Sequence, residues 1–371
     1  MRRVAIAARR VSGLSGAARM IVEHARRLSA GGWEVEVFAE KLDRKALVEA
    51  GATPRWVPAW PWGSWAKRRA FAAAAGRMTR GFDLVHGHGD LLEQDALSLH
   101  NCVHAAHEAR HGTPLPASDA VGRMHALQLA ERRFRILIAN SKLMKDDVER
   151  RFGVPPELVT VIYPGYDSCR FNAGGRPDFG PAMRAELGVK DDEVLFGLVT
   201  SGDFEKRGLR PFLKAFAAVA RELPRAKALV VGKETRPGPY KALVAELGLG
   251  ARVLFRDPVP EVWKYYHALD AYVHAAAWEE FGMTVLEALA CGVPVIAGEK
   301  TGASELLRGD QRGFVLPVPD EAALTRAMLE LGRDAGLRAR LGALGPAAAV
   351  SCGWDRGAAA LGALYDSLLK K

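Results

Sequence analysis

The sequence predicts an α/β protein built from two doubly wound parallel-sheet domains, and three observations lead to this prediction. Short β-branched or apolar runs alternate with Ala-rich amphipathic stretches along the 371 residues, as in βαβ units. The alternation stops over residues 163–181, which contain three Pro and four Gly, and then restarts. At ~150 residues per domain the length fits two or three domains, so we expect one sheet in each half.

Strands in the first half are expected where short apolar or β-branched runs occur. These runs cover residues 4–8, 34–39, 84–88, 96–100, 136–139 and 159–163. In the second half they cover residues 194–200, 228–232, 253–256, 271–275, 294–297 and 313–316. Amphipathic stretches such as residues 17–30 and 211–222 are expected to form helices between the strands.

The pause at residues 163–181 is interpreted as a linker between two domains. The first domain is expected to span residues 1–165 and the second residues 166–352. A C-terminal helix near residues 353–371 can pack back on the first domain. Two doubly wound sheets that face each other create a cleft, and ligands are expected at the carboxyl ends of their strands.

The composition excludes several classes of protein. With 49% apolar and 26% charged residues, a fibrous, collagen-like or wholly disordered chain is ruled out. No run of about 18 apolar residues is present to span a membrane, and the apolar run near the N-terminus is too short for a signal peptide. The four cysteines form no C-x-x-C pair, which argues against a disulfide framework or zinc site and for a cytoplasmic location.

The net charge of +9 is concentrated in the first half of the chain. Residues 1–166 hold 25 Lys and Arg against 17 Asp and Glu, whereas residues 167–371 hold 27 against 26. The basic half is therefore expected to meet an anionic partner such as a phosphate, a nucleic acid or an acidic membrane. The alternative is that this charge serves solubility alone.

The most informative segment covers residues 278–294, WEEFGMTVLEALACGVP. Glu279 and Glu287 lie eight residues apart, and a helix is expected to begin near Met283. The free N–H groups of its first turn would attract a phosphate or a sugar hydroxyl, and the carboxylates could accept hydrogen bonds from sugar hydroxyls. The alternative is a capping box, because Thr284 and Glu287 have the required spacing.

This segment resembles the E-x7-E segment of retaining GT-B glycosyltransferases, in particular glycosyltransferase family 4, and the resemblance extends over essentially the whole chain. The segments IAN-S at residues 138–141, VIYPGYD at 161–167 and DLVHGH at 83–88 are similar to other motifs of that family. Residues 202–208 and 100–102 look most like the lipopolysaccharide core glucosyltransferases. The resemblance implies a GT-B fold, two Rossmann-like domains facing a cleft, and retention of anomeric configuration.

Residues 202–208, GDFEKRG, follow the first expected strand of the second domain. Lys206 and Arg207 would there offer cations to a diphosphate leaving group. The family usually has Lys directly before the closing glycine, so which cation meets which phosphate stays open. The alternative is a pair of solvated surface charges.

Two further features of the first domain match the family. Residues 13–16, GLSG, follow the first strand and are not a G-x-G-x-x-G fingerprint, but they resemble a glycine loop that approaches the donor diphosphate. Ser15 could instead serve as a helix N-cap. The resemblance places His100 in the cleft near the transferred sugar, with a surface histidine as the alternative. The sequence contains no D-x-D, so no metal is expected to bridge the diphosphate.

The resemblance implies a defined set of site residues. In the implied mechanism Glu279 holds the sugar ring and Glu287 the ribose. The residues expected in catalysis are His100, Lys206, Arg207 and Glu279. The residues expected to bind the donor are Ser15, Gly16, Gly202, Lys206, Arg207, Lys233, Val259, Glu279, Phe281, Gly282, Met283, Thr284 and Glu287.

A tryptophan-rich segment precedes three cations in the first domain. It contains Trp56, Trp60, Trp62 and Trp65, followed by Lys67, Arg68 and Arg69. Tryptophans beside cations suit the interface of an anionic membrane. The residues expected to meet acceptor or membrane are Arg19, Trp60, Trp62, Trp65, Lys67, Arg68 and Arg69. The alternative is that two of the four tryptophans pack into the core.

The sequence therefore predicts a metal-independent retaining glycosyltransferase without a cofactor. It is expected to transfer a hexose from a UDP-sugar to a membrane-associated glycan or glycolipid such as the lipopolysaccharide core. UDP-glucose is the favoured donor. Its partners would be the donor, the acceptor and the anionic inner face of the plasma membrane, with no nucleic acid, because no nucleic-acid fold signature is present. The alternatives are a nucleotide-sugar hydrolase or epimerase and a non-catalytic basic binding protein of the same fold.

Overall fold

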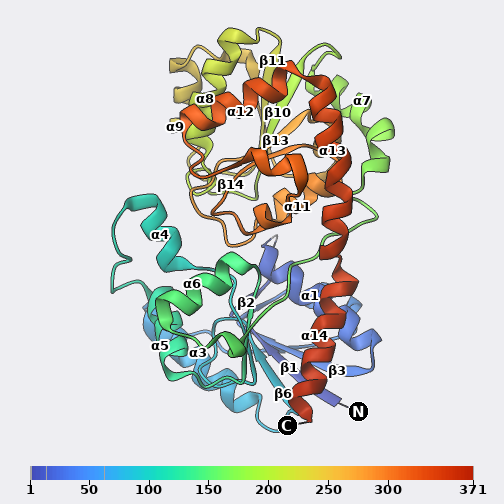
Figure 1. Ribbon diagram of the computed structural model, residues 1–371. Helices are drawn as coiled ribbons and strands as arrows, with labels where there is room; N and C mark the ends of the chain where they lie inside the picture. The colour runs from blue at the N-terminus through green and yellow to red at the C-terminus, as the bar shows by residue number, and fades with distance from the viewer. Residues whose placement is uncertain (1, 14, 62, 371) are drawn as a thin grey trace. The chain divides into compact units, whose positions relative to one another are not determined.

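A computed structural model describes residues 2–13, 15–61 and 63–370 of the chain (Figure 1). The chain divides into two compact units. The first unit consists of Met1–Gly165 and Trp354–Lys371, and the second of Tyr166–Gly353. Each unit is built on its own parallel sheet, so the predicted α/β class with two Rossmann-like domains is confirmed.

The first unit contains a seven-stranded sheet with the order β5-β3-β1-β6-β7-β8-β9. Its strands are β1 (Arg2–Ala7), β3 (Trp33–Ala39), β5 (Thr53–Trp56), β6 (Leu84–Gly87), β7 (Ala96–Ser98), β8 (Ile136–Ala139) and β9 (Val159–Val161). A separate parallel pair joins β2 (Arg10–Val11) to β4 (Lys41–Leu42). The helices are α1 (Gly16–Ala30), α2 (Arg44–Glu49), α3 (Ser64–Met78), α4 (Val103–His111), α5 (Ala120–Glu131), α6 (Lys142–Phe152), η1 (Pro156–Leu158) and α14 (Trp354–Leu369).

The second unit contains a six-stranded sheet with the order β12-β11-β10-β13-β14-β15. Its strands are β10 (Val194–Val199), β11 (Ala226–Val231), β12 (Val253–Arg256), β13 (Ala271–His274), β14 (Val295–Gly298) and β15 (Val315–Leu316). The α-helices are α7 (Arg176–Leu187), α8 (Leu209–Glu222), α9 (Gly238–Glu246), α10 (Trp263–Ala268), α11 (Met283–Ala290), α12 (Glu321–Arg333) and α13 (Ala335–Ala349). Short 3₁₀ turns are η2 (Ala173–Gly175), η3 (Gly250–Arg252), η4 (Gly302–Leu306), η5 (Gly309–Phe314) and η6 (Val350–Cys352).

Strand order in both sheets reverses at the first strand of the unit. β1 lies between β3 and β6, and β10 lies between β11 and β13. In an open parallel sheet this reversal sends the connections to opposite faces, so the loops at the carboxyl ends of the two flanking strands diverge and leave room for a ligand. The loops after β10 and β13 are therefore the natural site in the second unit.

The structure corrects several sequence-based element boundaries. The expected linker is too long, because α7 begins at Arg176 and includes Pro177 in its first turn, where proline's missing N–H has no cost. The expected strand at 313–316 is reduced to Val315–Leu316, which follows η5. Strand β5 is absent from the prediction because it contains Pro54, which an edge strand tolerates.

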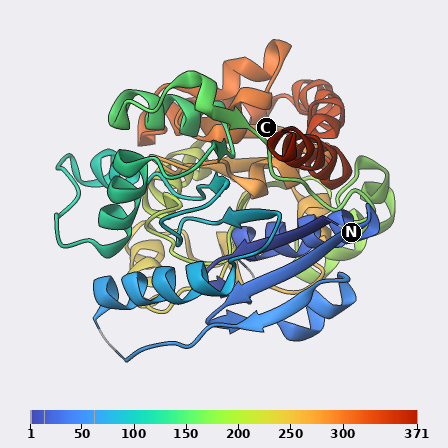
Figure 2. The same cartoon turned by 90° about the horizontal axis from the view of Figure 1, so that it is seen from below.

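The C-terminal helix α14 completes the core of the first unit. Leu361, Tyr365 and Leu368 are buried together with apolar residues of β1, β3 and α1. The Tyr365 ring meets the edge of the Trp33 ring at a centroid distance of 5.3 Å. Helix α14, dark red in Figure 2, accordingly lies beside the N-terminal strand. A segment distant in sequence is thus required to bury one face of this sheet.

The core of the second unit is formed mainly by α8 and α12 against the sheet. Phe212 and Phe216 of α8 are fully buried, as is Leu324 of α12. They pack with Phe196 and Leu198 of β10. Their burial fixes β10 from one side and leaves its carboxyl-terminal loop to carry polar side chains.

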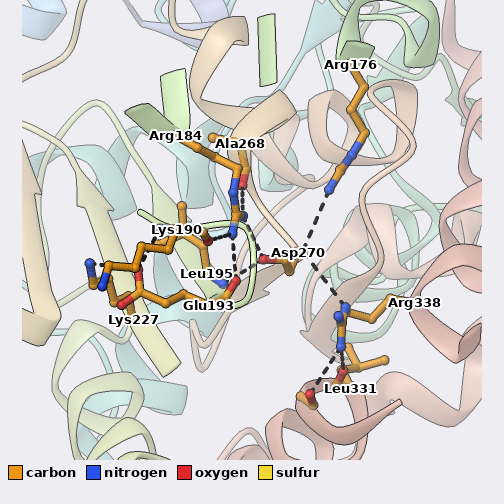
Figure 3. A network of polar contacts seen from close by, with 11 residues as sticks. Arg176, Arg184, Lys190, Glu193, Leu195, Lys227, Ala268, Asp270, Leu331 and Arg338 are labelled. Carbon is orange, nitrogen blue, oxygen red and sulfur yellow. Dashed lines mark hydrogen bonds and ion pairs between the residues drawn. The ribbon is translucent and has the colours of Figure 1, made fainter. Parts of the chain in front are cut away.

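A half-buried carboxylate ties the helices to the opposite, amino-terminal edge of the same sheet. Asp270, directly before β13, accepts hydrogen bonds from Arg184 Nη1 at 2.9 Å and from the Leu195 backbone N–H at 2.8 Å (Figure 3). Arg176 lies 3.8 Å and Arg338 4.0 Å from the other oxygen. This network joins α7, α13, β10 and β13.

No helix in the described part of the chain is both long and apolar enough to cross a membrane.

Candidate functional site

The candidate site lies at the carboxyl edge of the second sheet, where the loops that follow β10 and β13 run side by side. These two strands pair directly, with Phe196 opposite Ala271. The first loop contains Gly202–Gly208 and the second contains Trp278–Gly282. The parallel pairing therefore brings together two predicted motifs that are about 75 residues apart in sequence.

The loop after β10 has a backbone that only glycine permits at two positions. Gly202 has φ +151°, and a Cβ there would lie 2.6 Å from the carbonyl oxygen of Lys233. Gly208 has φ +72°, and a Cβ there would lie 2.0 Å from the carbonyl oxygen of Ala275. The loop is thus pressed against the ends of β11 and β13. Glu234 holds it further by accepting the Phe204 backbone N–H at 2.9 Å.

The loop after β13 is fixed by backbone hydrogen bonds to residues that follow β14. The N–H of Glu279 donates to the carbonyl of Lys300 at 2.9 Å, and its carbonyl accepts from Gly302 at 3.0 Å. The carbonyl of Phe281 accepts from Ala303 at 2.6 Å. The side chain of Glu279 is therefore presented from a rigid backbone, which is what a precise binding site requires.

Four charged side chains from the two loops form two ion pairs, which we call the ion-pair cluster. Arg207 contacts Glu279, and Lys206 Nζ lies 3.4 Å from Glu280 Oε2. Both carboxylate residues are buried, at 7% and 4% exposure, whereas both cations are half-buried. Burial lowers the pKa of Arg207 from its ordinary value. The predicted cations Lys206 and Arg207 are thus together with the predicted Glu279, and they are not a solvated face.

Two polar side chains of β13, His274 and Tyr272, lie next to the ion-pair cluster and its helix. His274 Nε2 lies 3.5 Å from Glu279 Oε2, and burial lowers the pKa of His274 to about 3. Its ring is therefore uncharged near neutral pH. The Tyr272 hydroxyl donates to Thr284 Oγ1 at 2.7 Å. The sheet thus supplies uncharged hydrogen-bonding groups beneath the ion pairs.

Helix α11 begins at the cluster with Gly282 as its N-cap. Gly282 has φ +94°, a left-handed conformation, and no side-chain cap bond is formed in this described segment. The capping-box alternative for Thr284 and Glu287 is therefore wrong. Glu287 is buried and accepts a hydrogen bond from the Tyr266 hydroxyl at 3.0 Å. The N–H groups of Val285 and Leu286 donate to the Gly282 carbonyl, so Met283 and Thr284 carry the N–H groups at the start of the helix that lies at the cluster.

The remaining donor-binding predictions of the second unit lie at the same edge and differ in exposure. Lys233 follows β11, and Val259, which is 38% exposed, follows β12. Phe281 is buried, and Met283 and Thr284 are half-buried. Gly202 and Gly282 shape the backbone rather than contribute a side chain.

In the first unit, the predicted residues of the glycine loop lie at the start of α1. Ser15 is the N-cap and accepts the Ala18 N–H at 3.2 Å, so the N-cap alternative is realised. Gly16 is the first helical residue, and Arg19 lies half-buried one turn later. The loop after β1 therefore enters a helix N-terminus, as the sequence predicts.

His100 is half-buried and contacts His88, which with His86 forms a buried histidine pair at the carboxyl edge of the first sheet. His88 Nδ1 and His100 Nε2 share a hydrogen bond of 2.7 Å, and their rings stack at 5.0 Å between centroids. The His86 ring lies 4.3 Å from the His88 ring, tilted by 34°, and His86 hydrogen-bonds to Tyr365 at 2.6 Å and Ser98 at 2.8 Å. Burial lowers the pKa of His100 to about 4, so the imidazole is neutral near pH 7. His100 is therefore a half-buried, hydrogen-bonded histidine and not an exposed surface one.

The tryptophan-rich segment is only partly a surface cluster. Trp56 is 54% exposed at the end of β5, whereas Trp60 and Trp65 are half-buried. Trp62 lies outside the described residues. Trp65 on α3 is covered by the guanidinium of Arg123, 4.2 Å from its ring centroid.

The three cations that follow this segment differ in exposure and in pairing. Arg68 turns inward and donates to Asp90 at 2.8 Å, with 15% of its side chain exposed. The structure therefore corrects the inclusion of Arg68 among the surface cations, because its guanidinium is paired with the half-buried carboxylate of Asp90. Arg69 is exposed and Lys67 half-buried, so these two are available at the surface of α3.

Several polar residues of these sites are not identified by the sequence reasoning. Glu280, His274, Tyr272 and Tyr266 contact the predicted residues in the second unit, and His88 contacts His100 in the first. Glu280 and His88 stand inside segments already singled out, which is the only signal that could have found them. The two tyrosines and His274 read as ordinary strand or helix residues. Among the described residues, no group of three or more His, Cys, Asp or Glu side chains is arranged to hold a metal.

Comparison with known families assigns each unit separately. The family described as "Glycosyl transferases group 1" matches residues 181–347, and "Glycosyltransferase Family 4" matches residues 14–170. A D-inositol 3-phosphate glycosyltransferase from Streptomyces bingchenggensis is 30% identical over 391 residues, covering 94% of this chain and 84% of the relative. One from Salinispora arenicola is 29% identical, covering 93% and 85%.

Solved structures share the fold at lower identity. WaaG, a glycosyltransferase involved in lipopolysaccharide biosynthesis, superposes with a TM-score of 0.82 at 19% identity, covering 98% of this chain and 99% of its own. Anabaena Alr3699/HepE in complex with UDP and glucose superposes with a TM-score of 0.80 at 20% identity, covering 99% and 100%. The family and the GT-B fold predicted from sequence are thereby confirmed. On these matches, and on the identity and coverage of the streptomycete relative, the chain belongs to the group 1 glycosyltransferases of family 4.

Proposed function

We propose that this glycosyltransferase is a retaining enzyme that transfers a hexose from a UDP-sugar, with glucose as the favoured hexose. The observation that carries the proposal is the ion-pair cluster at the start of α11. It places two cations, a buried carboxylate and the N-terminus of α11 at one edge of the sheet. HepE, which has the same fold, is described with UDP-glucose.

The cluster suits departure of a nucleoside diphosphate. Lys206, Arg207 and the first-turn N–H groups of α11 would neutralise the charge that develops on the leaving phosphate. Glu279, paired with Arg207, would accept hydrogen bonds from the sugar hydroxyls. The bond from C1 to the phosphate oxygen breaks, the acceptor oxygen bonds to C1 on the same face, and its proton passes to the leaving phosphate. No metal or cofactor enters this scheme.

Two residues are proposed to complete donor and acceptor binding. Glu287, oriented by the hydrogen bond from Tyr266, would accept hydrogen bonds from the ribose hydroxyls. His100, held neutral and oriented by His88, would hydrogen-bond the transferred sugar or the acceptor.

The acceptor is proposed to be an anionic, phosphate-bearing glycan or glycolipid, such as the lipopolysaccharide core. The basic first half of the chain supports this, as does the fold shared with WaaG. A second candidate is a small phosphorylated polyol, because the relatives at 30% and 29% identity are described as D-inositol 3-phosphate glycosyltransferases. Both acceptors carry phosphate, and they differ in whether a lipid is attached.

The donor is tested by calorimetry with UDP, GDP and ADP. UDP is expected to bind, and Arg207→Met should lower turnover by about 10²- to 10³-fold, the cost of losing one charge-stabilising donor. Glu299→Gln is the matched control, since Glu299 forms an exposed pair with Lys300 at 3.5 Å. Binding of GDP or ADP in place of UDP would contradict the donor assignment.

The acceptor is tested by offering lipopolysaccharide core and inositol phosphate with the bound donor. Transfer to one of them identifies the acceptor class, and mass spectrometry of the product gives the added mass. Release of nucleotide without any acceptor would instead favour the hydrolase or epimerase alternative. Binding without turnover would favour the non-catalytic alternative.

We further propose that the protein is cytoplasmic and binds the inner face of the plasma membrane through the exposed part of its tryptophan-rich segment. Trp56, Lys67 and Arg69 supply an aromatic and two cations there. Binding to anionic liposomes should exceed binding to neutral liposomes and weaken as salt increases. Lys67→Glu with Arg69→Glu should reduce it, and equal binding to both liposomes would contradict the proposal.

A further inference from the structure

Glu280 is the member of the ion-pair cluster to which the proposed mechanism gives no task. It is 4% exposed and follows Glu279 in the loop after β13. A buried carboxylate beside a site for an anion is unfavourable unless it serves a compensating purpose. The interaction that compensates this buried charge must therefore come from the side chains that Glu280 contacts.

Among its contacts, Glu280 pairs with Lys206, the predicted cation that has the more flexible side chain. Glu280 Oε2 lies 3.4 Å from Lys206 Nζ, and 5% of the Glu280 side chain is exposed against 21% for Lys206. Lysine carries its charge on a flexible four-carbon stem, whereas the planar guanidinium of Arg207 is pre-organised. The ammonium group of Lys206 needs a fixed partner to stay in the site instead of turning to the nearby solvent.

We propose that Glu280 is a positioning residue that holds the Lys206 ammonium group where the donor diphosphate binds. The inference rests on the proposed role of Lys206 toward the diphosphate. Glu280 itself does not touch the substrate; it acts through Lys206. The rigid backbone of residues 279–281 transmits this position, since it is bonded to residues 300–303.

A purely electrostatic role for Glu280 would have the opposite effect. If its charge only weakened the field of the cations, removing the charge would tighten binding of UDP. If it positions Lys206, removing the charge releases the ammonium group, and binding weakens despite the more positive site. The sign of the change in UDP affinity therefore separates the two roles.

The experiment is a double-mutant cycle on the whole protein. Glu280→Gln, Lys206→Met and the double variant are compared by calorimetric UDP binding and by kcat and KM for UDP-glucose. Glu280→Gln keeps the shape but exchanges a charged hydrogen bond for a neutral one. It should raise KM and lower kcat/KM about tenfold. In the Lys206→Met background, Glu280→Gln should change KM and kcat/KM each by less than about twofold. Glu280→Asp, which keeps the charge, should recover part of the loss.

Circular dichroism of every variant checks that the fold is retained, and Glu299→Gln should behave as wild type. Tighter UDP binding by Glu280→Gln, or an equal effect of this change in both backgrounds, would overturn the positioning role while leaving the proposed function in place. Wild-type protein that binds no UDP and transfers no sugar would overturn the proposed function and this inference with it.

Discussion

Gly208 offers a direct test of how closely the two loops of the site must approach. A Cβ at this position would lie 2.0 Å from the carbonyl oxygen of Ala275, where ordinary contact begins at 3.4 Å. Gly208→Ala must therefore separate the loops after β10 and β13 by about 1.4 Å, or distort one of them. Lys206 and Arg207 stand immediately before this position, and their partners stand on the other loop.

The expected effect has a stability part and an activity part. Alanine in a left-handed conformation costs roughly 1–2 kcal/mol, and overpacking adds roughly 1–3 kcal/mol. We expect the free energy of opening of the second unit to fall by about 3 kcal/mol. A displacement of about 1 Å in a catalytic constellation costs about 10²-fold in rate. Donor kcat/KM should therefore fall by about that factor.

Gly188 is a matched control within the same unit. It ends α7 with φ 67° and ψ 34°, against φ 72° and ψ 31° at Gly208. No described atom lies within 4 Å of a Cβ built there. Gly188→Ala should therefore carry the conformational cost alone, about 1 kcal/mol, and leave activity unchanged. Hydrogen exchange of amides in β10 and β13 measures the opening free energy, and steady-state kinetics measure kcat/KM. Equal behaviour of the two variants would refute the reasoning.

Three further predictions concern buried polar groups. Asp270→Ala should destabilise the second unit by about 1.5–3 kcal/mol, because it removes the carboxylate that half-buried Arg184 contacts; Asp270→Asn should cost less, and hydrogen exchange in β13 checks both. Tyr266→Phe should cost about 1.5–3 kcal/mol by removing a donor from buried Glu287, and a thermal midpoint equal to wild type would contradict this. Burial lowers the pKa of His86 to about 3, so the unfolded chain takes up its proton first and stability falls between about pH 6.5 and 3. Urea unfolding at pH 7, 6 and 5 should show this loss, and His86→Gln should reduce the slope by up to ~1.4 kcal/mol per pH unit.

Much of the fold is predictable because strand and helix signals are local. The expected strand at 253–256 coincides with β12, and the other expected strands overlap observed ones. The exceptions have physical causes. Pro54 hides an edge strand, and Pro177 disguises the start of a helix as a linker.

For the candidate site, the sequence predicts individual residues but not which of them contact one another. The motif around Glu279 and the pair Lys206 and Arg207 are visible in the sequence, and the structure places them at one sheet edge. Arg68 shows the limit of this reasoning, because nothing near it in sequence reveals that Asp90 holds its charge.

By itself, the sequence determined the family, the α/β class and the segments that carry charge, since periodicity and motifs depend on neighbouring residues. The tertiary structure alone decided which charges meet. Lys206 and Glu280 are 74 residues apart and meet because β10 pairs with β13. Likewise, Tyr365 reaches His86 across 279 residues because α14 returns to the first sheet. Such contacts follow from strand order and burial, which local patterns do not specify.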